Sequence, residues 1–445
     1  MASGDDQRDT IAAIATPAGR GGVGIVRISG PAAPLIARAV AGEVPPPRRA
    51  TLAVFADESG ERIDEGLALY FPAPHSYTGE AVLELHAHGG PVVMQMLLGS
   101  CVAAGARLAE PGEFTRRAFL EGKLDLAQAE AVADLIDAAS REAARSAQRS
   151  LSGEFSAAID AIVEQVTDLR ALVEALIDFP EEDIDALHAS DAARRLAGAQ
   201  DALTDLLQRS RQGSLLSGGL RVVIAGAPNA GKSSLLNRLV GEERAIVTPI
   251  AGTTRDALRE TIEIGGVPMT LVDTAGIRDS EDQIERLGVA RTKQELEHAD
   301  VVLAVIDAAD SKAPMWSGFP VGRARIDVFN KCDLVPSYVP PSGHPHPAVL
   351  LSTKTGEGLP ALRQAILAAI GWSSTGETVF LARERHLLAL EQALAHLHAA
   401  SIEQGRWELF AEELRLAQQA LGSITGPMTA DELLGRIFGR FCIGK

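Results

Sequence analysis

The sequence predicts a multidomain α/β protein: an α+β domain comes first, and a parallel α/β domain then interrupts a helical domain. Changes of pattern along the 445 residues carry this prediction. Short β-branched runs alternate with turns at first, and amphipathic helical spacing follows. Buried strand-like runs separated by helices come next, before the helical spacing returns. The length fits about three domains at ~150 residues each.

The α+β domain is placed at residues 1–122. Within it, Thr10–Ile14 and Gly24–Ile28 have the β-branched character of strands around a glycine-rich turn, and Ala81–His86 has the same character. Val92–Ala104 has the length and apolar content of a helix. Strands and helices that do not alternate regularly favour an α+β arrangement.

The helical domain is predicted from two chain segments, residues 123–215 and 376–445. Its helices are expected to break at Phe179-Pro180, because proline cannot continue a helix. Helical spacing returns in Arg383–Ser401 and Trp407–Leu421. Apolar residues recur three and four positions apart in the first segment: Leu124, Ala127, Ala131, Leu135, Ile159, Ile162, Val166, Leu169, Leu172 and Leu176.

The inserted α/β domain is placed at residues 216–375. Insertion requires that both junctions lie at the surface and close together, and the composition of Gln212–Gly219 and Gly371–Gly376 suits that role. Buried strands separated by helices predict a parallel sheet. The predicted strands are Arg221–Ala225, Thr270–Val272, Val301–Ile306, Ile326–Phe329 and Val349–Leu351.

Composition excludes several classes of protein. The net charge of −17 argues against a broad non-specific grip on nucleic acid, although most of the acidity lies in residues 123–215. Three separated cysteines, Cys101, Cys332 and Cys442, exclude a disulfide scaffold and a cysteine-cluster metal site. The polar, acidic start does not have the pattern of a signal peptide. We therefore expect a cytoplasmic protein that is not inserted in a membrane.

Gly226-Ala-Pro-Asn-Ala-Gly-Lys-Ser233 has the P-loop pattern, between the strand Arg221–Ala225 and the helix Ser234–Leu239. Glycines allow backbone N–H groups to close around phosphate oxygens, and the helix directs its positive end at them. Lys232 would reach the β- and γ-phosphates, and Ser233 would hold Mg²⁺. The phosphate-binding residues are predicted to be Asn229, Ala230, Gly231, Lys232, Ser233 and Ser234.

Four further elements follow in the order that a GTPase requires. Thr254 is the predicted second Mg²⁺ ligand, Asp273 would stand beside the water shell of that ion, and Asp333 would accept two hydrogen bonds that guanine supplies and adenine does not. Each element follows, or is expected to follow, the carboxyl end of a strand, so the sequence predicts a Ras-like P-loop GTPase domain. The nucleotide-binding residues in these elements are Thr248, Pro249, Ile250, Ala251, Gly252, Thr253, Thr254, Asp273, Thr274, Ala275, Gly276, Asn330, Lys331, Asp333, Ser352, Thr353 and Lys354.

One expected residue is absent. Many small GTPases place glutamine directly after the DxxG motif to orient the attacking water, and here that position is Ile277. From the residues alone, the replacement is open among the acids that follow. Asn229 in the P-loop offers an oxygen for a monovalent cation, which could take the part of an arginine finger. The candidate acids are Asp279, Glu281, Asp282 and Glu285.

The chain resembles the tRNA modification GTPase family usually called MnmE or TrmE over nearly its full length. The resemblance implies a tetrahydrofolate-binding N-terminal domain that also dimerises, a split helical domain and an inserted G domain. It rests on Thr16-Pro-Ala-Gly-Arg-Gly-Gly-Val-Gly24 with Arg27-Ile-Ser-Gly30, Pro111-Gly-Glu-Phe114, Lys123-Leu-Asp-Leu-Ala-Gln-Ala-Glu130, Gly231-Lys-Ser-Ser-Leu-Leu-Asn237, Gly252-Thr-Thr-Arg-Asp256, Phe380-Leu-Ala-Arg383 and Phe441-Cys-Ile-Gly-Lys445.

The resemblance also implies an activity and partners. With the flavoprotein usually called MnmG or GidA, in a heterotetramer or larger complex, the homodimer would add an aminomethyl-type group to C5 of the wobble uridine of certain tRNAs. The one-carbon unit would come from a 5-formyl- or methylene-tetrahydrofolate. By matching motifs, Glu285 would orient the water for GTP hydrolysis. The implied K⁺ ligands are Asn229, Thr248, Ile250 and Thr253, and the implied folate contacts are Arg27, Glu84, Lys123 and Lys445.

Two assignments remain open on the sequence. Cys442 is either catalytic or a neighbour of the folate site without covalent chemistry. His86 and His88 point the same way on a strand without a third ligand, so a metal there is disfavoured.

Two other functions compete with the enzyme. The first is a GTPase switch that only controls assembly, as in ribosome assembly; the second, a membrane-associated GTPase, lacks a basic amphipathic helix. The folate-like motifs and the C-terminal motif favour the modifying enzyme.

Overall fold

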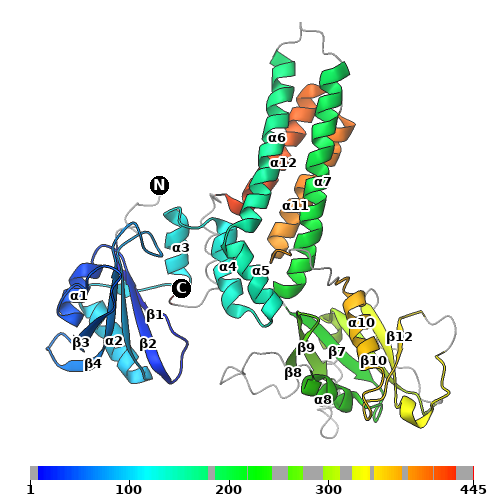
Figure 1. The fold of residues 1–445 in the computed structure, drawn as a ribbon, viewed down its shortest axis with the longest axis horizontal. Helices are drawn as coiled ribbons and strands as arrows, with labels where there is room; N and C mark the ends of the chain where they lie inside the picture. Colours follow the sequence, from blue (N-terminus) through cyan, green and yellow to red (C-terminus); the bar gives the residue numbers. More distant parts are fainter. Residues whose placement is uncertain are drawn as a thin grey trace. The chain divides into compact units, whose positions relative to one another are not determined.

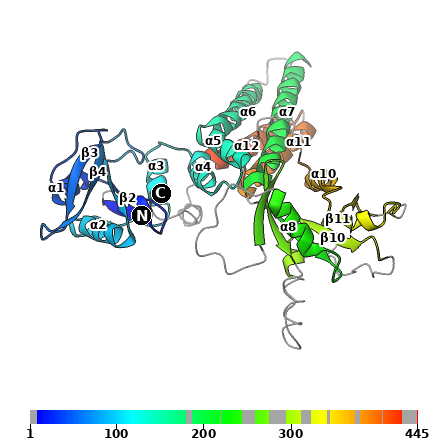
Figure 2. The same ribbon diagram turned by 60° about the horizontal axis from the view of Figure 1, so that its bottom comes forward.

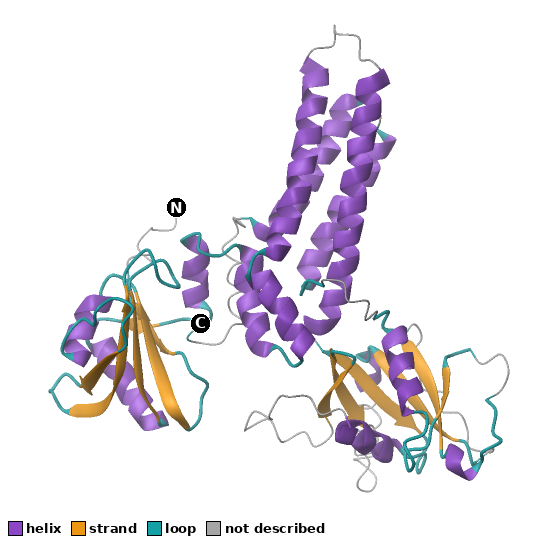
Figure 3. Cartoon of the chain, in the orientation of Figure 1, coloured by secondary structure: helices purple, strands orange, loops and turns teal. Residues whose placement is uncertain are grey.

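The computed structural model describes residues 9–178, 186–217, 219–242, 259–273, 294–310, 323–340, 345–372, 379–403, 405–426 and 444. The chain divides into two compact units, Met1–Ala133 with Gly422–Lys445, and Asp134–Leu421. Figure 3 distinguishes the mixed sheet-and-helix regions from the helical region between them in sequence. In the described ranges, no helix combines the length and apolar character needed to cross a membrane.

The first unit contains a six-stranded sheet in the order β3-β4-β5-β2-β1-β6 (Figure 1). Neighbouring strands are antiparallel except β6, which runs parallel to β1. The predicted strands β1, β2 and β5 are confirmed, whereas β3, β4 and β6 were not predicted. The bounds are β1 Ile11–Ile14, β2 Gly21–Ser29, β3 Thr51–Ala56, β4 Arg62–Phe71, β5 Val82–Gly89 and β6 Arg107–Leu108.

Helices cover the two faces of this sheet unequally. α1 (Ala33–Ala41) and α2 (Pro91–Ala103, predicted) pack in one core with the alternate side chains of the central strands. α3 (Glu113–Leu120) covers only the β1 part of the other face, through Phe114. Further along that face, the cross-strand partners Leu52 and Leu67 are 67% and 41% exposed. An apolar part of the sheet is therefore open to solvent.

The helical region is built from both predicted chain segments. α6, α7, α11 and α12 run side by side as a bundle (Figure 1). Gln200 on α7 donates to the Leu397 carbonyl on α11 at 2.8 Å, and Arg170 on α6 donates to Gln418 on α12 at 2.6 Å. The predicted break at Phe179-Pro180 lies outside the described residues. The bounds are α4 Leu126–Asp137, α5 Arg141–Leu151, α6 Glu154–Asp178, α7 Ala186–Ser217, α11 Glu384–Ile402 and α12 Trp407–Thr425.

The second sheet lies in the inserted segment, in the order β12-β11-β10-β7-β9-β8. Five strands are parallel, as predicted, but β8 is antiparallel to β9 and was not predicted. Charged residues interrupt β8, an edge strand, so it does not have the continuous apolar run of a buried parallel strand. The bounds are β7 Leu220–Gly226, β8 Arg259–Ile264, β9 Val267–Asp273, β10 Val301–Asp307, β11 Ala324–Asn330 and β12 Ala348–Leu350.

Four described helices share a core with one face of the second sheet, among them α7 through Leu216. α8 (Lys232–Glu242) and α10 (Leu359–Ala369) lie against it (Figure 2), and α5 of the helical region joins them through Ala143 and Ala147. Ser140, which caps the N-terminus of α5, donates at 2.7 Å to the Gly266 carbonyl in the turn between β8 and β9.

The two junctions of the insertion lie together, as the sequence predicts. Gln212 on α7 donates to the Gly371 carbonyl after α10 at 2.6 Å. One residue further, Gly213 is so close to the returning chain that a Cβ there would lie 1.7 Å from the Phe380 carbonyl oxygen. Ser146 on α5 donates to the Val379 carbonyl at 3.0 Å and holds the same returning segment.

Candidate functional site

The P-loop joins β7 to α8 at the carboxyl edge of the second sheet. Gly226 has a φ of +153° and Gly231 a φ of +98°, conformations that favour glycine. A Cβ at Gly226 would lie 2.2 Å from the Val305 carbonyl oxygen, and one at Gly231 would lie 2.1 Å from Asn330 Nδ2. Both glycines are therefore required by close packing of the loop against β10 and β11.

Lys232 and Ser233 are the first two residues of α8 and directly follow the P-loop. Lys232 is buried as a residue, and its ammonium donates at 2.8 Å to the Ala227 carbonyl across the loop. Ser233 Oγ donates at 2.7 Å to Asp273 Oδ2, and Asp273 is only 3% exposed. A hydroxyl and a carboxylate side by side form the hard oxygen donor set that Mg²⁺ prefers, with phosphates and water completing its shell.

Asn330 connects the P-loop to the loop after β12. Its Nδ2 donates to the Ala230 carbonyl at 2.9 Å, and its Oδ1 accepts from the Thr353 N–H at 3.1 Å. The side chain is fully buried. The structure thus brings three sequence motifs, separated by up to 123 positions in the chain, to one place.

The predicted guanine-recognising residue lies beside this connection. Asp333 Oδ1 accepts from Ser352 Oγ at 2.7 Å, and Ser352 is fully buried. Lys331 has a φ of +67° and its ammonium lies 2.5 Å from Asp307 Oδ2. Lys354 is exposed. Asp307 was not singled out from the sequence, although its place at the end of β10 was the available signal, because ligands bind at the carboxyl ends of parallel strands.

Two further predicted site residues, Asn229 and Ser234, are exposed. Asn229 has a φ of +62°, and Ser234 lies in the first turn of α8. The other predicted site residues lie outside the described part of the chain. The residues outside are Thr248, Pro249, Ile250, Ala251, Gly252, Thr253, Thr254, Thr274, Ala275, Gly276, Glu285, Cys442 and Lys445.

In the first unit, the predicted folate contacts Arg27 and Glu84 are cross-strand neighbours in β2 and β5. Arg27 Nε donates to Glu84 Oε1 at 2.9 Å, and His86 Nε2 lies 3.4 Å from Glu84 Oε2. The Arg27 guanidinium carbon lies 5.6 Å and 5.8 Å from the ring centres of Tyr77 and Phe114. Among the described residues, nothing hydrogen-bonds its two terminal nitrogens. This half-buried cation therefore has donors available for an acceptor-rich ligand.

Tyr77 and Phe114 were not predicted to belong to this site. Burial raises the pKa of Tyr77, and its hydroxyl shares a 2.8 Å hydrogen bond with Thr115. The predicted contact Lys123 is exposed, but its Cε lies 3.4 Å from the position of a Cβ on Gly79, two residues after Tyr77. Lys123 therefore approaches the loop that supplies Tyr77.

An ionic network holds α3 and this loop together. Arg117 is 7% exposed and pairs with Asp9 at 2.6 Å, Glu80 at 3.1 Å and Glu113 at 2.9 Å. Arg107 also pairs with Glu113, at 2.6 Å. Burial alone would raise the pKa of Glu113, but hydrogen bonds from Arg107, the Glu110 N–H and Arg117 lower it to about 2. The network fixes the elements that carry the two rings beside Arg27.

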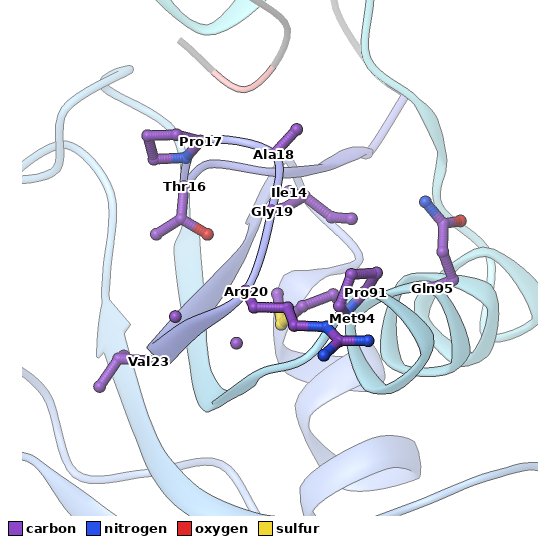
Figure 4. A pocket seen from close by; sticks show the side chains of 12 residues that line it. Ile14, Thr16, Pro17, Ala18, Gly19, Arg20, Val23, Pro91, Met94 and Gln95 are labelled. Atoms are coloured by element: carbon purple, nitrogen blue, oxygen red, sulfur yellow. The ribbon is translucent and has the colours of Figure 1, made fainter. Parts of the chain in front are cut away.

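A cavity of about 360 Å³ lies under the glycine-rich turn between β1 and β2. Figure 4 shows the side chain of Arg20 beside Pro91 and Met94 at the start of α2. Gly444 lies beside Ile14, which also lines this cavity: a Cβ on Gly444 would be 2.4 Å from the Ile14 carbonyl oxygen. Gly444 of the C-terminal motif therefore contacts β1, which pairs with the strand β2 that carries Arg27.

The described cysteines are not activated nucleophiles. Burial raises the pKa of the Cys101 thiol to about 12. Burial raises the pKa of Cys332 as well, and the charges of Glu357 and Asp333 add to the effect. His88 lies 2.9 Å from Asp64 and His86 contacts Glu84, so the two histidines face different carboxylates. The described residues contain no cluster of three or more metal-binding side chains.

The fold and the site define a P-loop GTPase domain, inserted in a helical domain that follows an α+β domain. Two family models match the chain: "MnmE helical domain" over residues 126–442 and "GTP-binding protein TrmE N-terminus" over residues 10–123. The chain belongs to the MnmE (TrmE) family.

Full-length relatives agree with this assignment. The chain is 58% identical to "tRNA modification GTPase MnmE" of Azoarcus sp. (strain BH72) over 98% of each protein. It is 56% identical to the protein of the same name from Ralstonia nicotianae, over 98% of this chain and 96% of the relative. It is likewise 56% identical to that of Dechloromonas aromatica, over 98% and 99%.

Proposed function

We propose that the protein binds and hydrolyses GTP at the carboxyl edge of its second sheet, as part of a tRNA-modifying activity. The connection made by Asn330 carries this proposal, because it holds the P-loop and the Ser352–Lys354 loop in one site with Asp333. The relatives named tRNA modification GTPase support the tRNA part.

In this proposal, Lys232 binds the β- and γ-phosphates and Ser233 holds Mg²⁺ beside Asp273. The Asp333 carboxylate accepts hydrogen bonds from the guanine N–H groups. Ser352 Oγ, which donates to Asp333 Oδ1, holds this carboxylate in place. Thr254 completes the Mg²⁺ site, and Glu285 orients the attacking water. A K⁺ ion among Asn229, Thr248, Ile250 and Thr253 supplies positive charge in the transition state.

The first unit would bind a tetrahydrofolate that carries the one-carbon unit. Glu84 suits the amino and N–H groups of a pterin, and Arg27 retains donors for its carbonyl or for a carboxylate. Lys123 and Lys445 would contact the same ligand. Gly444 lies beside Ile14. We propose Cys442, two residues earlier in the sequence, as a catalytic or a neighbouring residue of this site.

The proposed product is an aminomethyl-type group at C5 of the wobble uridine, made in the cytoplasm with a flavoprotein of the MnmG (GidA) type. Homodimerisation is proposed through the first unit, where exposed Leu52 and Leu67 on the open sheet face support it. The proposed domain limits remain 1–122, 123–215 with 376–445, and 216–375.

GTP turnover by the full-length protein in K⁺ or Na⁺ buffer, with and without the flavoprotein, tests the activity. We expect fast turnover only in K⁺, since Na⁺ is smaller than the proposed site. The Asp333→Asn variant should lose GTP affinity and gain affinity for xanthosine triphosphate. Unchanged GTP affinity in a calorimetric titration would contradict the guanine assignment.

Folate binding separates this function from that of a ribosome-assembly switch. A switch that only controls assembly has no use for a one-carbon carrier. A calorimetric titration of the full-length protein with 5-formyl-tetrahydrofolate should show saturable binding. Its absence would favour the switch.

A further inference from the structure

Asp307 occupies a position that no predicted motif explains. It ends β10, directly opposite Asn330 in the parallel register with β11. Both of its carboxylate oxygens are engaged: Oδ2 pairs with the Lys331 ammonium at 2.5 Å, and Oδ1 accepts from the Ala309 N–H at 3.0 Å. The Ala308 N–H donates to the Asn330 carbonyl at 2.9 Å, which fixes the ends of the two strands together.

Lys331 is held in an unusual backbone conformation. Its φ of +67° is one that residues other than glycine rarely adopt. This turn allows the side chain of Lys331 to reach Asp307 on the neighbouring strand, while Asp333, two residues later, bonds to Ser352. The Asp307–Lys331 ion pair thus holds one end of the segment that presents Asp333.

We propose that Asp307 is a positioning residue of the guanine-binding site and acts through Lys331. The inference rests on the proposed binding of guanine nucleotide. Lysine has many rotamers, so an ammonium already held by a carboxylate loses less conformational freedom when a ligand binds. The pair is 32% and 18% exposed at its two side chains, so solvent only partly screens it.

The Asp307–Lys331 ion pair should affect binding of the nucleoside part of the ligand rather than of its γ-phosphate. Asp307 and Lys331 lie at the ends of β10 and β11, beside Asn330 and Asp333, whereas Ser233 and Asp273 lie where Mg²⁺ and the phosphates are proposed. The loss of the ion pair should therefore weaken GTP and GDP equally.

Displacement of a fluorescent guanine nucleotide from full-length Asp307→Asn tests the proposal. Kd should rise about fivefold for both GTP and GDP, as expected for one partly exposed ion pair. KM for GTP should rise by the same factor while kcat at saturating GTP changes little. The matched control Asp310→Asn removes an exposed carboxylate three residues away and should bind both nucleotides like the wild type.

A double-mutant cycle with Lys331→Met distinguishes positioning from a general structural effect. In the Lys331→Met background, Asp307→Asn should cause no further loss of affinity, because its target is gone. The inference would be overturned if the affinity losses of Asp307→Asn and Lys331→Met were additive, or if Asp307→Asn bound nucleotide like the wild type. Either result would leave the proposed binding of GTP intact. If the wild-type protein itself does not bind GTP, the proposed function fails and the inference fails with it.

Discussion

Gln212 and Gly371 lie on opposite sides of the inserted domain in sequence and are joined by a 2.6 Å hydrogen bond. The chain therefore leaves the helical domain and returns to it at one place. Beside this bond, Gly213 packs on the Phe380 carbonyl, and Arg209 lies 4.5 Å from the ring centre of Phe380. The insertion interrupts the helical domain without separating its two halves.

Gly213→Ala should destabilise the helical domain. The new Cβ would lie 1.7 Å from a backbone oxygen, so α7 or the returning chain must move. We expect a loss of at least ~2 kcal/mol in the free energy of unfolding, measured by urea titration. Gly198→Ala is the matched control in the same helix: nothing lies within 4 Å of its new Cβ, so it should stabilise by ~0.5–1 kcal/mol. Equal effects would contradict the close approach.

Ser140→Ala should loosen α5 from the turn between β8 and β9. The hydroxyl accepts from the Ala143 N–H at 3.1 Å and donates to the Gly266 carbonyl, so both an N-cap and a cross-link are lost. The expected cost is ~1–2 kcal/mol, read as faster amide hydrogen exchange in the first turn of α5. Ser152→Ala, at the exposed end of the same helix, should leave that exchange unchanged.

Glu84→Gln should weaken folate binding at least ~10-fold, because it removes the charge that Arg27 and a cationic or N–H-rich ligand would meet. GTP turnover should stay near the wild-type rate, since the nucleotide motifs lie in the other unit. Glu65→Gln on the neighbouring strand β4 is the control, because Glu65 pairs with Arg62 instead. Parallel loss of both activities in a folded protein would contradict the assignment of separate sites.

Acid should loosen α3 through Glu113. Its pKa is lowered to about 2 in the folded state, below the ordinary 4.5, so its ionised form stabilises the fold. That contribution is complete above pH ~4.5 and is lost as the pH falls towards 2. Glu113→Gln should cost about 3 kcal/mol at pH 7 and flatten this dependence. Hydrogen exchange in α3 measures both effects, and a variant that keeps the wild-type pH profile would exclude Glu113 as the cause.

The sequence was sufficient for contiguous motifs at strand ends. The P-loop between β7 and α8 could be predicted because its glycines, lysine and serine are adjacent, and the geometry of Gly226 and Gly231 confirms why glycine stands there. The split helical domain was predictable as well, because apolar spacing resumes after the insertion.

Features that depend on neighbours distant in sequence were not predicted. Alternation in the strand would assign Arg27 and Glu84 to a solvent face, yet they pair with each other across two strands. Asp307 gains its partner Lys331 only because β10 and β11 are adjacent. The strand β8 was missed because an edge strand tolerates charges that a buried one does not.

The contact between Gly444 and Ile14 has a consequence for the order in which the protein is made. The first sheet contains strands that are synthesised early, whereas Gly444, which lies against Ile14 of β1, is synthesised after the helical and nucleotide-binding domains. During synthesis on the ribosome, the contact of Gly444 with Ile14 in β1 can therefore form only after the other domains have been made. A chain whose synthesis stops early lacks this contact, even when every strand of the sheet has been made.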